Sequence, residues 1–136
     1  MNAVFFYGLF MDEELLKNKG LSPSRIEKAC IEGFGLRIGE RASLVKSESE
    51  KAYGLLMFMS HEDLTTLYSE QSVADYVPES ITVTASDNNE ILASTYNLPA
   101  DKLKGRNKEY ASSLAILAKN VGLPPEYVKE IESWAY

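Results

Sequence analysis

The sequence predicts an α+β protein in which about six strands precede two C-terminal helices. Segments rich in β-branched and aromatic residues recur through most of the chain and are separated by glycine-rich or polar turns. The last third instead carries apolar residues at helical spacing. The 136 residues fit one domain spanning 1–136. A chain of this size can bury one core without metal or disulfide support.

The N-terminal part contains a strand, a short helix and a long strand-forming region. Residues 3–7 form an apolar run that breaks at Gly8, which predicts a buried strand followed by a tight loop. Residues 11–18 are predicted as a short helix, with acids in its first turn and Lys17 near its end, as the helix dipole favours. Strand material follows over 28–47, where three glycines indicate bulges or close backbone approaches.

The middle of the chain is predicted to turn, to form a central strand and to enter a helix. Residues 47–51, SESEK, are expected to form a polar turn. Residues 52–59 are apolar almost throughout, which favours a strand buried on both faces. Ser60 is a natural N-cap for the following helix, with Asp63 placed as in a capping box.

A hairpin and two helices complete the chain. Strands at 80–85 and 91–98 flank a hairpin-type turn. One apolar stripe at helical spacing predicts a long helix, and it consists of Tyr110, Leu114, Leu117 and Val121. Gly122 and the two prolines after Leu123 end that helix, and a final helix is expected from Pro125 to about Trp134.

Composition excludes several classes of function. The net charge is -6, and the basic residues are scattered, so the stripe that nucleic-acid binding requires is absent from the sequence. The single cysteine, Cys30, favours a reducing compartment. The apolar start lacks a basic flank and is too short for a secretory signal or a membrane span. We therefore expect a cytoplasmic protein that binds neither nucleic acid nor membranes.

The residue inventory argues against metal and nucleophile chemistry. One histidine and one cysteine cannot form a usual zinc site, so we expect no metal. Catalysis by a histidine-activated nucleophile would have to use His61, which we expect at an exposed helix start. The glycine-rich segment at 33–40 lacks the spacing and the Lys-Ser/Thr pair of phosphate loops.

The loop after the first strand offers a more specific possibility. It consists of Tyr7, Gly8, Leu9 and Phe10. Its backbone N–H groups, next to a helix N-terminus, could hold an anion. It could also be a plain strand-to-helix turn, because the acids at 12–14 already supply negative charge there. Tyr76 and Tyr110 are by default core residues with hydrogen-bonded hydroxyls, and Glu70 alone would be a surface carboxylate.

Four segments, taken in order, resemble a known family. They are FFYGLF, AYGLLMFMSHEDLTTLY, ADYVPESITV and EYASSLAILAKNVGLPPEYVKEI. Together they resemble the γ-glutamylcyclotransferase-like family, which includes the AIG2-like and bacterial YtfP-like proteins. The resemblance covers nearly the whole chain and rests on the order and spacing of the segments. It implies a small mixed β-barrel of about six strands with flanking and C-terminal helices.

The resemblance also implies a reaction. In active members, the backbone amides of the loop bind the γ-glutamyl group, and the Glu of an L-D-x-x-E-G segment is the acid/base. The substrate's α-amine attacks its own γ-carbonyl, which forms 5-oxoproline and expels an amine or amino acid. One positioned carboxylate can move both protons, and no cofactor is required. The expected partner is a small γ-glutamyl-containing molecule.

The catalytic position departs from the family pattern. An alignment from Leu67 places Gln71, which cannot transfer protons, at the family Glu, and leaves Glu70 one residue early. On a helix that offset rotates the side chain by about 100°. Only an irregular backbone could then aim Glu70 inward as a displaced acid/base. The implied substrate-binding residues are Tyr7, Gly8, Leu9, Phe10, Gln71, Tyr76 and Tyr110, of which Leu9 replaces the usual Ser or Thr.

Three functions follow as alternatives. The first is a γ-glutamylcyclotransferase-type enzyme, which requires Glu70 to face a pocket beside the 7–10 loop. The second is a non-catalytic binding protein that has lost the catalytic Glu. The third is a domain that acts through protein contacts, against which an open cavity of a few hundred Å³ would argue. No pattern in the sequence specifies the leaving group or an oligomer interface.

Overall fold

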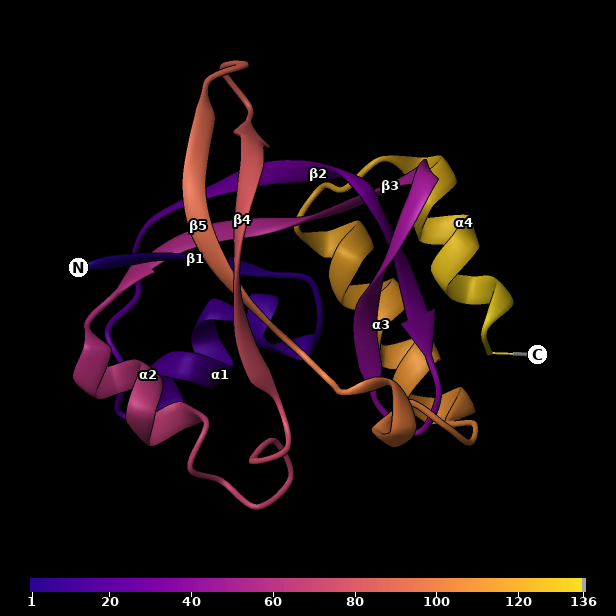
Figure 1. Ribbon diagram of the computed structural model, residues 1–136, viewed down its shortest axis with the longest axis horizontal. Coiled ribbons are helices and arrows are strands. Elements are labelled where there is room, and N and C mark those ends of the chain that lie inside the picture. The colour runs from indigo at the N-terminus through magenta and orange to yellow at the C-terminus, as the bar shows by residue number, and fades with distance from the viewer. Residues whose placement is uncertain (136) are drawn as a thin grey trace.

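Five strands close into a barrel in the computed structural model, which describes residues 1–135 (Figure 1). The strands are β1 (Asn2–Phe6), β2 (Ser24–Ile38), β3 (Ala42–Met59), β4 (Val77–Ala85) and β5 (Glu90–Asn97). Their order around the barrel is β1-β3-β2-β4-β5. The β1–β5 contact is parallel, and the other paired strands are antiparallel. The fold is therefore the predicted mixed barrel, with five strands instead of about six.

Helices pack outside the barrel in two groups, with α1 and α2 on one side and α3 and α4 on another (Figure 1). They are η1 (Leu9–Met11), α1 (Glu13–Asn18), α2 (His61–Leu67), η2 (Ala100–Lys102), α3 (Lys108–Asn120) and α4 (Pro125–Ser133). The predicted N-cap is confirmed, since the Ser60 side chain accepts a hydrogen bond from the Asp63 N–H at 3.1 Å. The longest helix among residues 1–135 is α3, with 13 residues. No described helix is long and apolar enough to cross a bilayer.

The polar turn predicted at 47–51 is wrong. Those residues lie inside β3, and the chain reverses instead between the end of β2 at Ile38 and the start of β3 at Ala42. The pairing of β2 with β3 shifts between Glu32, which faces Lys51, and Phe34, which faces Lys46. Four residues of β3 thus face one residue of β2. The polar composition of 47–50 reflects this exposed irregularity in a continuing strand.

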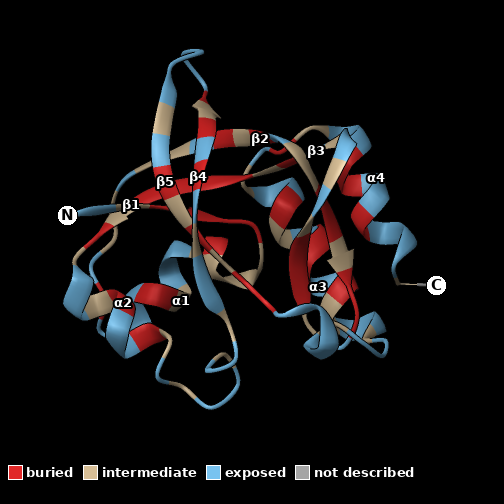
Figure 2. Ribbon diagram, in the orientation of Figure 1, coloured by how far each residue is buried: buried red, intermediate tan, exposed pale blue. Residues whose placement is uncertain are grey.

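The hydrophobic core fills the barrel and continues beneath α3 and α4 (Figure 2). The apolar run in β3 is buried on both faces as predicted, because consecutive residues Leu55, Leu56 and Met57 are all at most 5% exposed. The stripe on α3 is only partly confirmed. Leu114 is fully buried, but Tyr110, Leu117 and Val121 are half-buried.

One glycine in β3 sets how closely β1 can approach. A Cβ at Gly54 would overlap the Phe6 carbonyl oxygen and would lie 3.0 Å from the Phe5 ring. Phe6 is the last residue of β1, and its partner in β3 is Leu55. Gly54 therefore allows the end of β1, and the loop that follows it, to lie tightly against the barrel.

An ion pair at the far end of the β2–β3 hairpin makes stability depend on pH. Arg37 Nη2 lies 2.6 Å from Glu50 Oε2. The hydrogen bond from Arg37, followed by one from Ser47, lowers the pKa of Glu50 from 4.5 to about 2. Because the folded-state pKa is the lower one, the stabilisation is present above about pH 4.5 and is lost as the pH falls toward 2.

We expect Glu50→Gln to lower the free energy of unfolding by less than about 1 kcal/mol at neutral pH, since over a third of each side chain is exposed to solvent. Near pH 2 the loss should largely disappear. Urea denaturation of both proteins at the two pH values measures the difference. An equal loss at both pH values would contradict this role of the ion pair.

Candidate functional site

A cavity of about 370 Å³ opens beside the loop that follows β1. The loop 7–10 forms one wall, and residues 40–42 and the segment 68–76 form others. Single side chains come from the end of α1, from β5 and from the start of α3, and they are Lys19, Tyr96, Asn107 and Tyr110. The cavity therefore gathers residues from across the sequence, and it has the size typical of a small-molecule site.

The loop after β1 is held from below by a buried polar network. The Tyr7 hydroxyl lies 2.6 Å from the Tyr96 carbonyl oxygen and 2.9 Å from Asn97 Oδ1. Asn97 Oδ1 also accepts a hydrogen bond from the Leu44 N–H at 3.1 Å. Tyr7 is 5% exposed and Asn97 is 8% exposed. These bonds fix the backbone of Tyr7 and so orient the residues that follow it.

Gly8 and the Tyr110 hydroxyl lie next to each other in the lining of the cavity. A Cβ at Gly8 would lie 2.8 Å from the Tyr110 hydroxyl, so only glycine fits there without a shift. Tyr110 stands in the first turn of α3, where its N–H donates to the Asn107 cap at 2.9 Å. Burial raises the pKa of the Tyr110 hydroxyl to about 12, and a backbone hydrogen bond at Leu9 acts in the opposite direction. The phenol is therefore protonated at neutral pH.

Tyrosines form much of the remaining wall. Tyr68 stacks on Tyr96, with ring centroids 3.8 Å apart and an interplanar angle of 9°. Phe10 meets Tyr68 edge to face at 5.9 Å. Burial is the main cause that raises the pKa of Tyr68 and of Tyr76 above the usual range. These side chains make a largely apolar, neutral surface around the charged groups of the cavity.

Glu70 lines the cavity and Gln71 does not. The helix α2 ends at Leu67, and the backbone from Tyr68 to Asp75 forms irregular turns, with a hydrogen bond from the Val73 N–H to the Glu70 carbonyl oxygen at 3.0 Å. Both Glu70 carboxylate oxygens lie within 2.9 Å of Lys19 Nζ. Gln71 is exposed. The structure thus brings Glu70 together with the 7–10 loop, Tyr76 and Tyr110, and leaves Gln71 outside.

Arg41 holds the segment that carries Glu70. Its guanidinium donates to the Ser72 carbonyl oxygen at 3.3 Å and to Asp75 Oδ2 at 3.2 Å, and lies 5.8 Å from the centre of the Tyr76 ring. The Tyr76 hydroxyl donates to the Ala42 carbonyl oxygen at 2.5 Å. The segment 68–76 is therefore fastened to the β2–β3 turn, and this position decides where Glu70 points.

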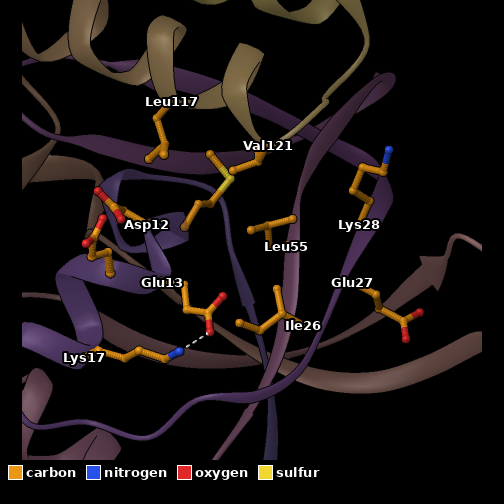
Figure 3. A pocket seen from close by; sticks show the side chains of 11 residues that line it. Asp12, Glu13, Lys17, Ile26, Glu27, Lys28, Leu55, Leu117 and Val121 are labelled. Atoms are coloured by element: carbon orange, nitrogen blue, oxygen red, sulfur yellow. Dashed lines mark ion pairs between the residues drawn. The ribbon is translucent and has the colours of Figure 1, made fainter.

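A larger groove of about 650 Å³ lies between α1, the β2–β3 strands and α3 (Figure 3). Its floor is apolar, and its rim carries the exposed Lys17–Glu13 ion pair at 2.8 Å. It contains none of the residues that the sequence assigned to the site. Within the described chain, no three His, Cys, Asp or Glu side chains gather where they could hold a metal ion.

The sequence alone did not indicate that several of the cavity residues belong to the site. They are Lys19, Arg41, Tyr68, Tyr96 and Asn107. Asn107 carried a local signal, because it caps α3. The others are brought to the cavity by long-range contacts and have no local pattern that indicates a site. The cavity lining carries two acidic side chains, Glu40 and Glu70, and two cationic ones, Lys19 and Arg41, beside a neutral aromatic wall. This arrangement suits a small polar molecule that carries both charges.

Known proteins with similar sequences place the chain in a family. A model of the AIG2-like family matches residues 51–131. The γ-glutamylcyclotransferase of Bos taurus is 27% identical over 97 residues, which are 70% of this chain and 52% of that protein. The chain thus spans about half the length of this curated relative.

Solved structures show the same fold. A structure of γ-glutamyl cyclotransferase has a TM-score of 0.77 at 20% identity and covers 97% of this chain and 86% of its own. YkqA from Bacillus subtilis has a TM-score of 0.79 at 18% identity over 98% of this chain and 54% of its own. A yeast γ-glutamyl cyclotransferase specific to glutathione has a TM-score of 0.69 at 13% identity, over 98% and 95%. The chain belongs to the AIG2-like family and has the γ-glutamylcyclotransferase fold.

Proposed function

We propose that the protein converts a γ-glutamyl amide to 5-oxoproline and a free amine or amino acid, with Glu70 as the acid/base. The observation that carries this proposal is the position of Glu70 in the wall of the cavity, beside the 7–10 loop, Tyr76 and Tyr110. The similarity to proteins named γ-glutamylcyclotransferase supports the same class of reaction.

The chemistry needs one proton acceptor near the substrate's α-nitrogen. The Glu70 carboxylate takes a proton from the α-ammonium, and the resulting amine attacks the γ-carbonyl carbon. A new C–N bond closes the five-membered ring as the bond to the leaving nitrogen breaks. Glu70 then gives its proton to that nitrogen. The second proton, which the ring nitrogen loses as it becomes an amide, follows the same route through Glu70, so the amine leaves as an ammonium ion. Because the attack is intramolecular, holding the γ-glutamyl chain curled supplies much of the remaining acceleration.

The cavity walls fit the other parts of such a substrate. The neutral tyrosine surface of Tyr68, Tyr76 and Tyr96 can pack against the methylene groups of the γ-glutamyl chain. The loop at 7–10 and the Tyr110 hydroxyl provide polar atoms close to the cavity. Tyr110 is protonated at neutral pH, so it can donate a hydrogen bond to a carbonyl oxygen.

The two alternatives from the sequence differ in how well they fit the geometry. A binding protein without catalysis was favoured by Gln71 at the family Glu position, but Gln71 lies outside the cavity and Glu70 lies in it. A domain without a ligand site is disfavoured by a cavity of about 370 Å³. Leu9 remains as support for the binding-only alternative, because it removes a hydroxyl from the loop.

A substrate panel tests the proposed reaction. The purified protein is incubated with γ-glutamyl dipeptides and γ-glutamyl amines, and 5-oxoproline is measured by mass spectrometry. We expect release from at least one γ-glutamyl compound and none from the matching α-glutamyl isomer or from a substrate with an acetylated α-amine. Ring closure without a free α-amine is impossible by this route. Binding of the panel without any release of 5-oxoproline would support the binding-only alternative instead.

A further inference from the structure

The ammonium group of Lys19 binds the Glu70 carboxylate that the proposed reaction needs as its proton acceptor. Lys19 Nζ lies 2.9 Å from Glu70 Oε1 and 2.8 Å from Oε2, so it binds both oxygens. We propose that Lys19 recognises the α-carboxylate of the substrate, and that the Lys19–Glu70 ion pair opens to admit the zwitterionic α-carbon. This inference rests on the proposed function for the identity of the ligand, and it assigns the residue that selects the α-carboxylate.

The backbone around Lys19 has a well-defined conformation at the end of α1. Lys19 is the C-cap of α1, and its N–H bonds to the carbonyl oxygens of Leu15 and Leu16. Gly20 follows with a φ of 84°, a left-handed conformation that ends the helix. A cation at a helix C-terminus is favoured by the helix dipole. The backbone of Lys19 is therefore fixed where its side chain can line the cavity.

The two cations that line the cavity have different partners. Arg41 is engaged by Asp75 and by the Ser72 carbonyl oxygen, and these contacts fasten the 68–76 segment. Across the described part of the chain, the Lys19 ammonium is hydrogen-bonded to Glu70 alone. When Glu70 binds the substrate ammonium, Lys19 is the cation that is released. Its charge can then bind an anion in the same place.

An α-amino acid group carries such an anion. Its ammonium nitrogen and its carboxylate carbon are about 2.5 Å apart across the α-carbon. The ammonium can therefore bind Glu70 while the carboxylate binds Lys19. The four charges then alternate around a ring, and neither protein group is left without a partner. An amine without the carboxylate would compete with Lys19 for Glu70 and would offer the lysine no anion in return.

The simpler reading is that Lys19 only ties α1 to the segment after α2. A separate tether already joins these regions, because the Ser22 N–H donates to Asp63 Oδ2 at 3.0 Å. A structural role predicts that removal of the lysine weakens every ligand equally. Recognition of a carboxylate predicts a loss that depends on the carboxylate.

Equilibrium binding of two uncleavable probes separates these readings. Both probes derive from a γ-glutamyl methyl ester in which a methylene group replaces the γ-carbonyl group, so neither contains a carbonyl carbon that the amine could attack. One probe keeps the α-carboxylate group, and the other has a hydrogen atom at that position. Dissociation constants are measured by NMR titration for the wild-type protein, Lys19→Met, Lys19→Arg and the control Lys17→Met. Lys17 lies on the same helix, but its side chain is 60% exposed and faces Glu13.

We expect the wild-type protein and Lys17→Met to bind the probe with the carboxylate about tenfold more tightly than the probe without it. That ratio corresponds to the contribution of one charged hydrogen bond at a partly exposed site. Lys19→Met should bring that ratio close to one, and Lys19→Arg should restore most of it. An unchanged ratio in Lys19→Met, or no binding of either probe by the wild-type protein, would overturn the inference. Failure of the substrate panel with the ratio intact would instead overturn only the proposed reaction.

Discussion

Replacement of Glu70 by Gln should lower the rate of 5-oxoproline release by about 10²–10⁴-fold, the usual contribution of one acid/base. The amide keeps the shape of the side chain and can still form hydrogen bonds, but it cannot accept a proton from the α-ammonium. The fold should persist, because the side chain is 37% exposed and a pair of this kind contributes little to stability. Steady-state kinetics on a substrate found with the panel measures the change.

Gln71 provides the matched control for Glu70. It is the adjacent residue, but it is exposed and does not line the cavity. Gln71→Ala should leave the rate within about twofold of the wild-type value, and the double exchange Glu70→Gln with Gln71→Glu should not restore activity. Recovery of activity in the double exchange would show that position 71 supplies the acid/base. That result would contradict the assignment of Glu70.

Gly54→Ala should lower the free energy of unfolding by about 3 kcal/mol, at the upper end for an overpacked core site. The added Cβ would overlap the Phe6 carbonyl oxygen, which is backbone and cannot rotate away. β1 would have to move outward at its end, where the 7–10 loop begins. Because that loop lines the cavity, we also expect weaker substrate binding. Thermal and urea denaturation measure the stability change.

Gly33→Asn separates steric overlap from the general effect of replacing a strand glycine. Gly33 lies in β2 at a φ of 84°, and a Cβ there would meet no atom within 4 Å. Asn tolerates this conformation well, so the loss should stay below about 1 kcal/mol. Similar losses for the two variants would mean that the contact of Gly54 with β1 is not the cause.

The parts of the fold that could be predicted depend on local patterns. The Ser60 cap, the apolar run in β3 and the glycine end of α3 are each set by neighbouring residues, and all three are confirmed. The turn at 47–51 was wrong because an exposed bulge and a turn share the same polar composition. The local pattern gives no sign that β3 continues through the bulge, since that depends on pairing with β2.

The position of Glu70 could not be derived from its neighbours. Helical geometry relates residues 70 and 71 only where the backbone is helical, and α2 ends at Leu67. Beyond that point the chain path is set by Arg41 and by the hydrogen bond from Tyr76 to Ala42, both about 30 residues away in sequence. Lys19 was missed for the same reason, because its partner Glu70 is 51 residues distant.

A crystal structure of Glu70→Gln with an uncleaved γ-glutamyl amide would test most directly whether this cavity is the catalytic site. We expect the γ-glutamyl chain inside the cavity, with its α-nitrogen at the side chain of residue 70 and its γ-carbonyl near the 7–10 loop. A ligand bound instead in the groove beneath α3, or an empty cavity at a saturating ligand concentration, would contradict the assignment of this cavity as the site.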